Sequence, residues 1–166
     1  MTTATRRKPR AKKPEGQWKI DGTTPLNADE EIKQADDALA VRQRVIDIYS
    51  KEGFSSIPAE DLAPRFKWLG LYTQRNQNLG GEMTSKLTNA ELQDEYFMMR
   101  VRFDGGRADP AKLRAVGEIS RDYARSTADF TDRQNIQLHW IEIENVPAIW
   151  EKLRSVGPVS YTHLTL

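Results

Sequence analysis

The chain has 166 residues, of which 38% are hydrophobic and 30% charged, as is typical of one globular domain rather than a membrane protein. It contains no cysteine, which excludes disulfides, thiolate metal sites and cysteine nucleophiles within the chain. No apolar run reaches the roughly 18 residues of a transmembrane helix, and no apolar stretch of a secretory signal follows the basic start. We therefore expect a cytoplasmic location and no membrane partner.

Positive charge is concentrated at the beginning of the sequence. Residues 1–13 hold six Lys or Arg and no acidic residue, which leaves 19 basic and 24 acidic residues in the rest. Residues 1–16 also contain two prolines and almost no apolar side chain, so they cannot bury enough surface to offset the entropy of ordering. We expect a disordered basic tail, which either aids solubility or docks onto an acidic protein or nucleic acid.

Residues 17–90 predict an N-terminal extension with a helix, an extended segment and a loop. The helix is expected over residues 38–51, ended by Gly53, because apolar side chains fall mainly along one helical stripe. That stripe consists of Leu39, Val41, Val45, Ile46, Ile48 and Tyr49. Residues 65–75 (RFKWLGLYTQR) are expected to be extended, and residues 76–89, rich in Gly, Asn, Thr and Ser, predict a loop.

A strand and a helix are predicted next along the chain. Residues 96–103 (YFMMRVRF) alternate in the manner of a strand, with Met98, Arg100 and Arg102 on one face. The opposite face consists of Phe97, Met99, Val101 and Phe103. Asp109 and Pro110 mark a helix start, and the buried stripe of that helix is expected to consist of Leu113, Val116, Ile119, Ser120 and Tyr123.

A second strand is predicted over residues 128–143, and a last helix begins at Asn145 and ends near Gly157. The buried side of this helix is expected to consist of Val146, Ile149, Trp150 and Leu153. Two strands joined by a helical crossover normally lie parallel with a right-handed connection. The order indicates an α+β fold, a ferredoxin-like (split βαβ) half-domain. Its missing strands would come from residues 65–75 or from beyond the end of the chain.

One face of the second predicted strand carries an unbroken polar row, consisting of Thr131, Arg133, Asn135, Gln137 and His139. If this row lies beside Arg100 and Arg102 in one sheet, cations and amides meet on one face, which suits an anionic ligand. A plain solvent-facing sheet surface is the alternative. The pattern inverts at Ile141 and Ile143, which we interpret as a strand covered on both sides with a polar ligand over one end.

Other kinds of site have little support in the sequence. His139 and His163 are the only histidines, so no histidine metal site is expected, and there is no nucleophile elbow, Gly-rich phosphate loop or zinc spacing. A ferredoxin-like module that binds nucleic acid is the alternative function. However, YFMMRVRF lacks the glycine-aromatic spacing of RNA-recognition motifs, so nucleic acid is not the expected partner.

Four segments, in the same order, resemble ferredoxin-dependent sulfite/nitrite reductases of the actinobacterial type. They are LNADEEIK, RFKWLGLYTQR, YFMMRVRFDGG and TADFTDRQNIQLHWIEIENVPAIW, and the resemblance extends over residues 17–157. It implies an enzyme with sirohaem coupled to a [4Fe–4S] cluster. Such an enzyme reduces sulfite to sulfide or nitrite to ammonia with electrons from ferredoxin.

The resemblance also assigns expected roles to individual residues. Arg100 would face both the sirohaem and the substrate, as a catalytic residue. The pattern T-x-R-Q-x-x-Q-x-H would contact sirohaem side chains through Thr131, Arg133, Gln137 and His139. Tyr72 lies in a segment that would approach the cofactor. Some members of the family have an arginine where this chain has Asp129.

The resemblance further implies that much of the enzyme is missing from this chain. The cluster cysteines and a second related half belong to the C-terminal part, so the chain is expected to be an N-terminal fragment without activity of its own. We divide it into a tail (residues 1–16), an extension and loop (17–90), the half-domain (91–157) and a non-family tail (158–166, PVSYTHLTL). The preference between sulfite and nitrite is not determined by these residues.

Overall fold

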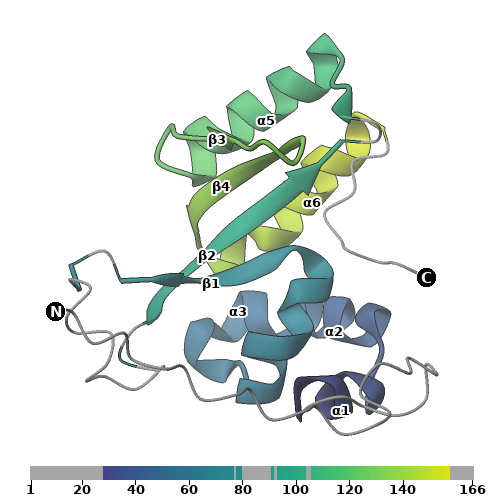
Figure 1. The fold of residues 1–166 in the computed structure, drawn as a ribbon, viewed down its shortest axis with the longest axis vertical. Coiled ribbons are helices and arrows are strands. Elements are labelled where there is room, and N and C mark those ends of the chain that lie inside the picture. The colour runs from purple at the N-terminus through teal and green to yellow at the C-terminus, as the bar shows by residue number, and fades with distance from the viewer. Residues whose placement is uncertain (1–27, 77, 80–90, 92, 104–105, 158–166) are drawn as a thin grey trace, which may run out of the picture.

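In a computed structural model, the described residues are 28–76, 78–79, 91, 93–103 and 106–157. The predicted basic tail, most of the predicted loop and the last nine residues lie outside them. No helix in this described part is long and apolar enough to cross a membrane. Figure 1 shows a twisted sheet with long helices beside it and a group of short helices at one end.

The sheet has four strands in the order β1-β2-β4-β3. These strands are β1 (Leu71–Arg75), β2 (Gln93–Arg102), β3 (Asp129–Phe130) and β4 (Asn135–Ile141). Every neighbouring pair is antiparallel. The prediction that one missing strand comes from residues 65–75 is confirmed, since β1 pairs with the edge of β2.

The predicted parallel pairing of the two strands in residues 96–103 and 128–143 is wrong. The long segment 128–143 is not one strand, because a turn at residues 131–134 divides it into β3 and β4. The crossover through the helix α5 (Pro110–Tyr123) therefore joins β2 to β3, and both of these are antiparallel to β4 between them. This arrangement is the split βαβ unit, and it confirms the ferredoxin-like fold.

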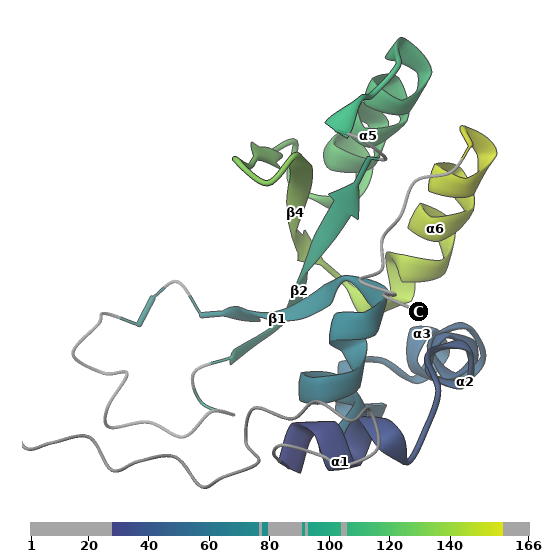
Figure 2. The same cartoon turned by 45° about the vertical axis from the view of Figure 1, so that its right-hand side comes forward.

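Two long helices cover one face of this sheet. They are α5 and α6 (Val146–Ser155), which lie on the same side of β2 and β4 in Figure 2. The Asp109 side chain caps α5 by accepting a hydrogen bond from the Lys112 backbone N–H at 2.9 Å, as the sequence predicts. Gly157 follows α6 with a φ of 96°, a conformation that favours glycine.

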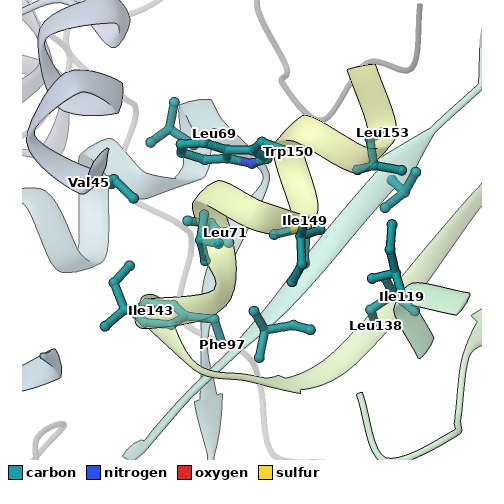
Figure 3. Close-up of a cluster of buried hydrophobic side chains, with 14 of the residues drawn as sticks. Val45, Leu69, Leu71, Phe97, Ile119, Leu138, Ile143, Ile149, Trp150 and Leu153 are labelled. Carbon is teal, nitrogen blue, oxygen red and sulfur yellow. The ribbon is translucent and has the colours of Figure 1, made fainter. Parts of the chain in front are cut away.

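The predicted buried stripes of these helices are confirmed except at Leu113 and at Tyr123, which is only partly buried. Val116, Ile119, Val146, Ile149, Trp150 and Leu153 are all buried. Leu113, by contrast, is 43% exposed. The side chains of α6 meet those of β1, β2 and β4 in one core, shown in Figure 3 around Trp150, Phe97 and Leu138.

Short helices form the N-terminal part: α1 (Ala28–Gln34), α2 (Ala38–Arg44) and α3 (Ser50–Glu52). A π-helical turn, Val45–Tyr49, joins α2 to α3, so the predicted helix over residues 38–51 is present. Gly53 ends it with a φ of 84°. Its buried side consists of Val41, Val45 and Tyr49, whereas the predicted core residues Leu39 and Ile48 are exposed.

The expected extended conformation of residues 65–75 is correct only for its second half. A π-helical turn (Asp61–Arg65) and a 3₁₀ turn (Phe66–Leu69) precede β1. Phe66 and Leu69 are three residues apart and both buried, which is the helical spacing. Gly70, with a φ of 68°, turns the chain from the helix into the strand.

A buried carboxylate, Asp61, ties these short segments together. Its two oxygens accept hydrogen bonds from Arg44 (2.9 and 3.0 Å), from Arg65 (2.8 Å) and from the Tyr49 hydroxyl (2.6 Å). Arg44 also contacts Asp36 at 2.6 Å. Burial and the hydrogen bond to Asp61 raise the pKa of Tyr49 to about 12, so this phenol stays a neutral donor.

Replacing Asp61 by asparagine should destabilise the chain. Arg44 and Arg65 would lose the buried negative charge that they share. Removing one partner of a buried ion pair lowers the free energy of unfolding by about 3 kcal/mol. Urea denaturation followed by circular dichroism measures this loss. Asp47→Asn is the matched control, because Asp47 is exposed and accepts only from Gln43 among the described contacts. Equal stability of the two variants would contradict the assigned role of Asp61.

Acid should remove this stabilisation. Burial works against ionisation of Asp61, but the hydrogen bonds from Arg44, Tyr49 and Arg65 outweigh it and hold its pKa below the usual value. The contribution is therefore complete above the unfolded-state pKa of about 3.9 and disappears as the pH falls through the lower folded-state pKa. Unfolding free energies measured from about pH 6 down to pH 2 should fall more steeply for the wild type than for Asp61→Asn.

Candidate anion-binding face of the sheet

The face of the sheet opposite α5 and α6 carries the predicted polar row. Phe97, Met99 and Val101 of β2 are buried on the helix side, so the intervening residues Met98, Arg100 and Arg102 point to the other face. Cross-strand pairs join Arg100 to Gln137 and Arg102 to Asn135. The expected alignment of the two polar rows in one sheet is therefore confirmed. We call this surface the open face.

Three arginines surround one hollow on the open face. The hollow has a volume of about 210 Å³, and it is lined by Arg100, Arg102, Arg133 and Asn135. Its described lining contains no acidic side chain. The Oδ1 atom of Asn135 is buried and has no hydrogen-bond partner among the described residues. Guanidinium groups converging in this way suit a carboxylate or another oxyanion, because each can form paired, charge-assisted hydrogen bonds.

Tyr72 supports one of these arginines. It pairs with Met98 across β1 and β2, and the guanidinium carbon of Arg100 lies 5.0 Å from the centre of the Tyr72 ring. Stacking of this kind holds a cation in place without using its outward N–H donors. The structure thus brings together Tyr72 and Arg100, two residues that the resemblance assigns to the cofactor site.

Thr131 and Arg133 reach this face from a turn rather than from a strand. The Thr131 N–H donates to the Asn135 carbonyl at 3.0 Å, and the Gln134 N–H donates to the Thr131 carbonyl at 3.2 Å. The Thr131 hydroxyl accepts the Arg133 N–H at 3.3 Å. The prediction of five polar residues on a single strand is therefore wrong for residues 131–134, although Arg133 still joins the hollow.

Gly106 allows this turn to pack against the end of β2. It has a φ of 68°, and a Cβ atom in its place would lie 2.5 Å from the Gln134 Oε1 atom. Any larger residue would therefore have to displace the Gln134 side chain, which belongs to the turn. Because Arg133 belongs to the same turn, this glycine helps to set the position of one of the three arginines.

A β-bulge explains the inversion of the polar pattern along β4. Leu138 pairs with Met99 and Ile141 with Phe97, so His139 and Trp140 together oppose the single residue Met98. Trp140 has a φ of 59°, which is uncommon for a residue with a Cβ atom. The extra residue returns Ile141 to the buried side. The inversion therefore follows from the bulge and does not by itself require a strand covered on both sides.

The bulge in β4 is held by a side chain of β1, although β1 and β4 are not paired in the sheet. Gln74 of β1 is 7% exposed, and its Oε1 atom accepts a hydrogen bond from the Trp140 backbone N–H at 2.9 Å. This bond satisfies an N–H that the bulge removes from the regular ladder. Nothing in the periodicity of β1 indicates that Gln74 has this role.

His139 lies at the edge of the open face. Its Nε2 atom is 3.2 Å from the Asp129 Oδ2 atom, and its ring is 5.7 Å from that of Trp140. Beyond the bulge, the guanidinium of Arg125 lies 5.0 Å from the Trp140 ring and 5.2 Å from the Tyr96 ring. We did not predict Arg125 or Asn135 as site residues. Arg125 lies outside both predicted strands, and periodicity does not distinguish Asn135 from the other polar residues of its row.

Metal ligands are not part of this arrangement. Among the described residues, no group of three or more His, Cys, Asp or Glu side chains is placed to hold a metal ion. The described polar groups of the open face are mainly arginines and amides, with His139 and Asp129 at its edge.

Comparison with known proteins identifies the fold and its family. Residues 90–156 match the model of the nitrite/sulfite reductase ferredoxin-like half domain. Residues 90–156 are thus a half domain of the nitrite/sulfite reductase type. The chain is 54% identical over 157 residues to a protein of Mycolicibacterium paratuberculosis named sulfite reductase [ferredoxin] 2, a match that covers 95% of this chain and 28% of that protein.

Two further members of the nitrite/sulfite reductase family extend the comparison. An assimilatory ferredoxin-dependent nitrite reductase of Haloferax mediterranei is 37% identical over 134 residues, covering 73% of this chain and 20% of that protein. The solved structure of the Mycobacterium tuberculosis NirA protein is 51% identical, with a TM-score of 0.80, over 90% of this chain and 27% of that one. The chain thus spans less than a third of the length of these relatives.

Removing the Gln74 acceptor should loosen the bulge. In Gln74→Leu the Trp140 N–H would be left without its partner, which costs about 2 kcal/mol when such a group is partly buried. We expect faster hydrogen exchange at the Trp140 amide, measured by NMR, and a lower urea midpoint. Gln137→Leu is the control, because Gln137 lies on the open face of β4 itself. Unchanged exchange at Trp140 in Gln74→Leu would show that the bulge is held by other contacts.

Proposed function

We propose that this chain is the N-terminal portion of a ferredoxin-dependent reductase that converts sulfite to sulfide or nitrite to ammonia. The higher identity to a protein named sulfite reductase than to one named nitrite reductase favours sulfite as the substrate. Ferredoxin would supply the electrons, as the names of these relatives indicate for them. The chain has no cysteine, so the ligands of a [4Fe–4S] cluster would come from the rest of the protein, and the chain alone would be inactive.

The observation that carries this proposal is the convergence of Arg100, Arg102 and Arg133 on one hollow. Sirohaem carries carboxylates around its ring, and the donor set of the open face suits such a group. In this proposal Arg133, Gln137, His139 and the Thr131 hydroxyl hold the cofactor. Sirohaem, when bound, supplies the iron at which the oxyanion is reduced.

Arg100 has a second proposed role, toward the substrate. It lies two residues before the end of β2, stacked on Tyr72, and its register partner is Gln137. A fixed cation at this place would attract sulfite or nitrite and stabilise negative charge on its oxygens. Stacking on the Tyr72 ring means that little reorganisation is needed when the anion arrives.

The proposal is tested by binding of sirohaem to the 166-residue chain, followed through the absorbance of the complex. Arg133→Ala should weaken binding about tenfold, the effect of losing one charge-assisted contact. Arg114→Ala removes the same charge from the exposed surface of α5 and should leave binding unchanged. Equal affinity of both variants would exclude this role for Arg133. A chain that is folded by circular dichroism but binds no sirohaem would contradict the proposal that the open face alone retains the cofactor.

A gel-shift assay with single-stranded RNA distinguishes the alternative function, nucleic-acid binding, from the proposed one. Binding to phosphates would be strong at low salt and fall steeply as salt rises. The proposed function predicts no shift at low salt. A salt-sensitive shift that the Arg133→Ala variant weakens would favour the alternative.

A further inference from the structure

Arg125 is held between two aromatic rings at the end of the open face that lies away from the arginine hollow. Its guanidinium carbon is 5.0 Å from the centre of the Trp140 ring and 5.2 Å from that of the Tyr96 ring. Tyr96 precedes buried Phe97, so strand alternation places its side chain on the open face. Arg100 is four residues further along β2, about 13 Å away in an extended strand. The open face therefore has a second cation that is supported by aromatic rings.

The ring of Trp140 supports Arg125 from an unfavourable backbone conformation. Trp140 has a φ of 59°, which residues with a Cβ atom rarely adopt. Regular pairing would place Trp140 opposite Phe97 and toward the core, whereas the bulge places it opposite Met98. The described ring contacts of the indole are His139 and Arg125. A bulky residue in such a conformation is the kind of outlier from which a function of the side chain is inferred.

The charge of Arg125 is not neutralised by a neighbour. Among the described residues it forms no ion pair or hydrogen bond, and its contacts are the two rings. Asp129 lies instead at His139, and the carboxylates near Tyr96 line a separate hollow. That hollow contains Asp94, Glu95, Glu142 and Glu144. Because a cation–π contact uses the face of the guanidinium, the N–H donors at its edge stay available to an anion.

We propose that Arg125 is a specificity-determining residue that binds a carboxylate on the far side of a tetrapyrrole whose near side is held at the arginine hollow. This inference rests on the proposed function, and it names the feature of the cofactor that the chain would recognise, carboxylates distributed around the whole ring. A tetrapyrrole with carboxylates at one edge can occupy the hollow without reaching Arg125. Trp140 and Tyr96 are positioning residues, because they hold the guanidinium on the open face.

Two iron-free porphyrins distinguish this role from a general contribution to folding. Uroporphyrin carries carboxylates all around its ring, whereas both carboxylates of deuteroporphyrin lie at one edge. Fluorescence measures the binding of each porphyrin to the 166-residue chain. Arg125→Ala should weaken uroporphyrin binding about fivefold, through loss of one charge-assisted contact, and leave deuteroporphyrin binding unchanged. Arg133→Ala should weaken the binding of both porphyrins, since Arg133 lines the hollow.

Arg114→Ala is the control, because it removes the same charge from the exposed surface of α5 and should leave both affinities unchanged. If Arg133→Ala weakens uroporphyrin binding and Arg125→Ala does not, the inference is overturned and the proposed function stands. Equal weakening of both porphyrins by Arg125→Ala would also overturn the inference, since a structural change of the face has that effect. If neither variant changes binding, the cofactor role proposed for the open face fails as well. A folded wild type that does not bind uroporphyrin would overturn the inference.

A second test uses the strained residue. Glycine readily adopts a φ near 59°, so Trp140→Gly can keep the backbone of the bulge and its hydrogen bond to Gln74 while it removes one ring beside Arg125. We expect weaker uroporphyrin binding by this variant. Arg125→Ala should then weaken binding less in the Trp140→Gly background than in the wild type, because both changes act through the same guanidinium. Full additivity of the two effects on affinity would overturn the positioning role of Trp140.

Discussion

The two faces of the sheet depend on one irregularity, the bulge at His139 and Trp140. Without an extra residue, β4 could not keep Ile136 and Leu138 in the core at one end and Ile141 at the other. The bulge also leaves Trp140 in a left-handed conformation that costs about 1–3 kcal/mol, and the hydrogen bond from its N–H to Gln74 helps to stabilise it. A contact between β1 and β4 thus allows one face of the sheet to pack in the core while the other presents the row of candidate anion-binding groups.

The N-terminal helices matter to the open face because they place β1. Buried Asp61 joins Arg44, Arg65 and Tyr49, and Arg65 also donates to the Ile32 carbonyl at 3.1 and 2.9 Å. These bonds fix the turns that lead through Gly70 into β1. Tyr72 and Gln74, which support Arg100 and the bulge, both lie on that strand. A charge network in the core of the extension therefore contributes to the geometry of a surface beyond the core.

The open face is one wall of a larger proposed site. Its arginines stand in one hollow without a described acidic neighbour in the lining, while the histidine at its edge has an aspartate as partner. The chain covers 28% of a ferredoxin-dependent sulfite reductase that it matches. In the proposed function the other walls, the cluster and the docking surface for ferredoxin belong to the remaining length. In the same proposal, this chain contributes the binding and orientation of an anion.

The sequence by itself determined the elements whose signals are local. Alternation identified β2 and its two faces, the Asp109 cap identified the start of α5, and the spacing of apolar residues identified α6, because each of these signals is set by neighbouring residues. Periodicity also grouped Arg100 with Gln137 and His139. Only the tertiary structure divided residues 128–143 into a hairpin, showed the bulge and paired Asp129 with His139. Each of these depends on a register or a contact between residues on different strands, which one-dimensional periodicity does not contain.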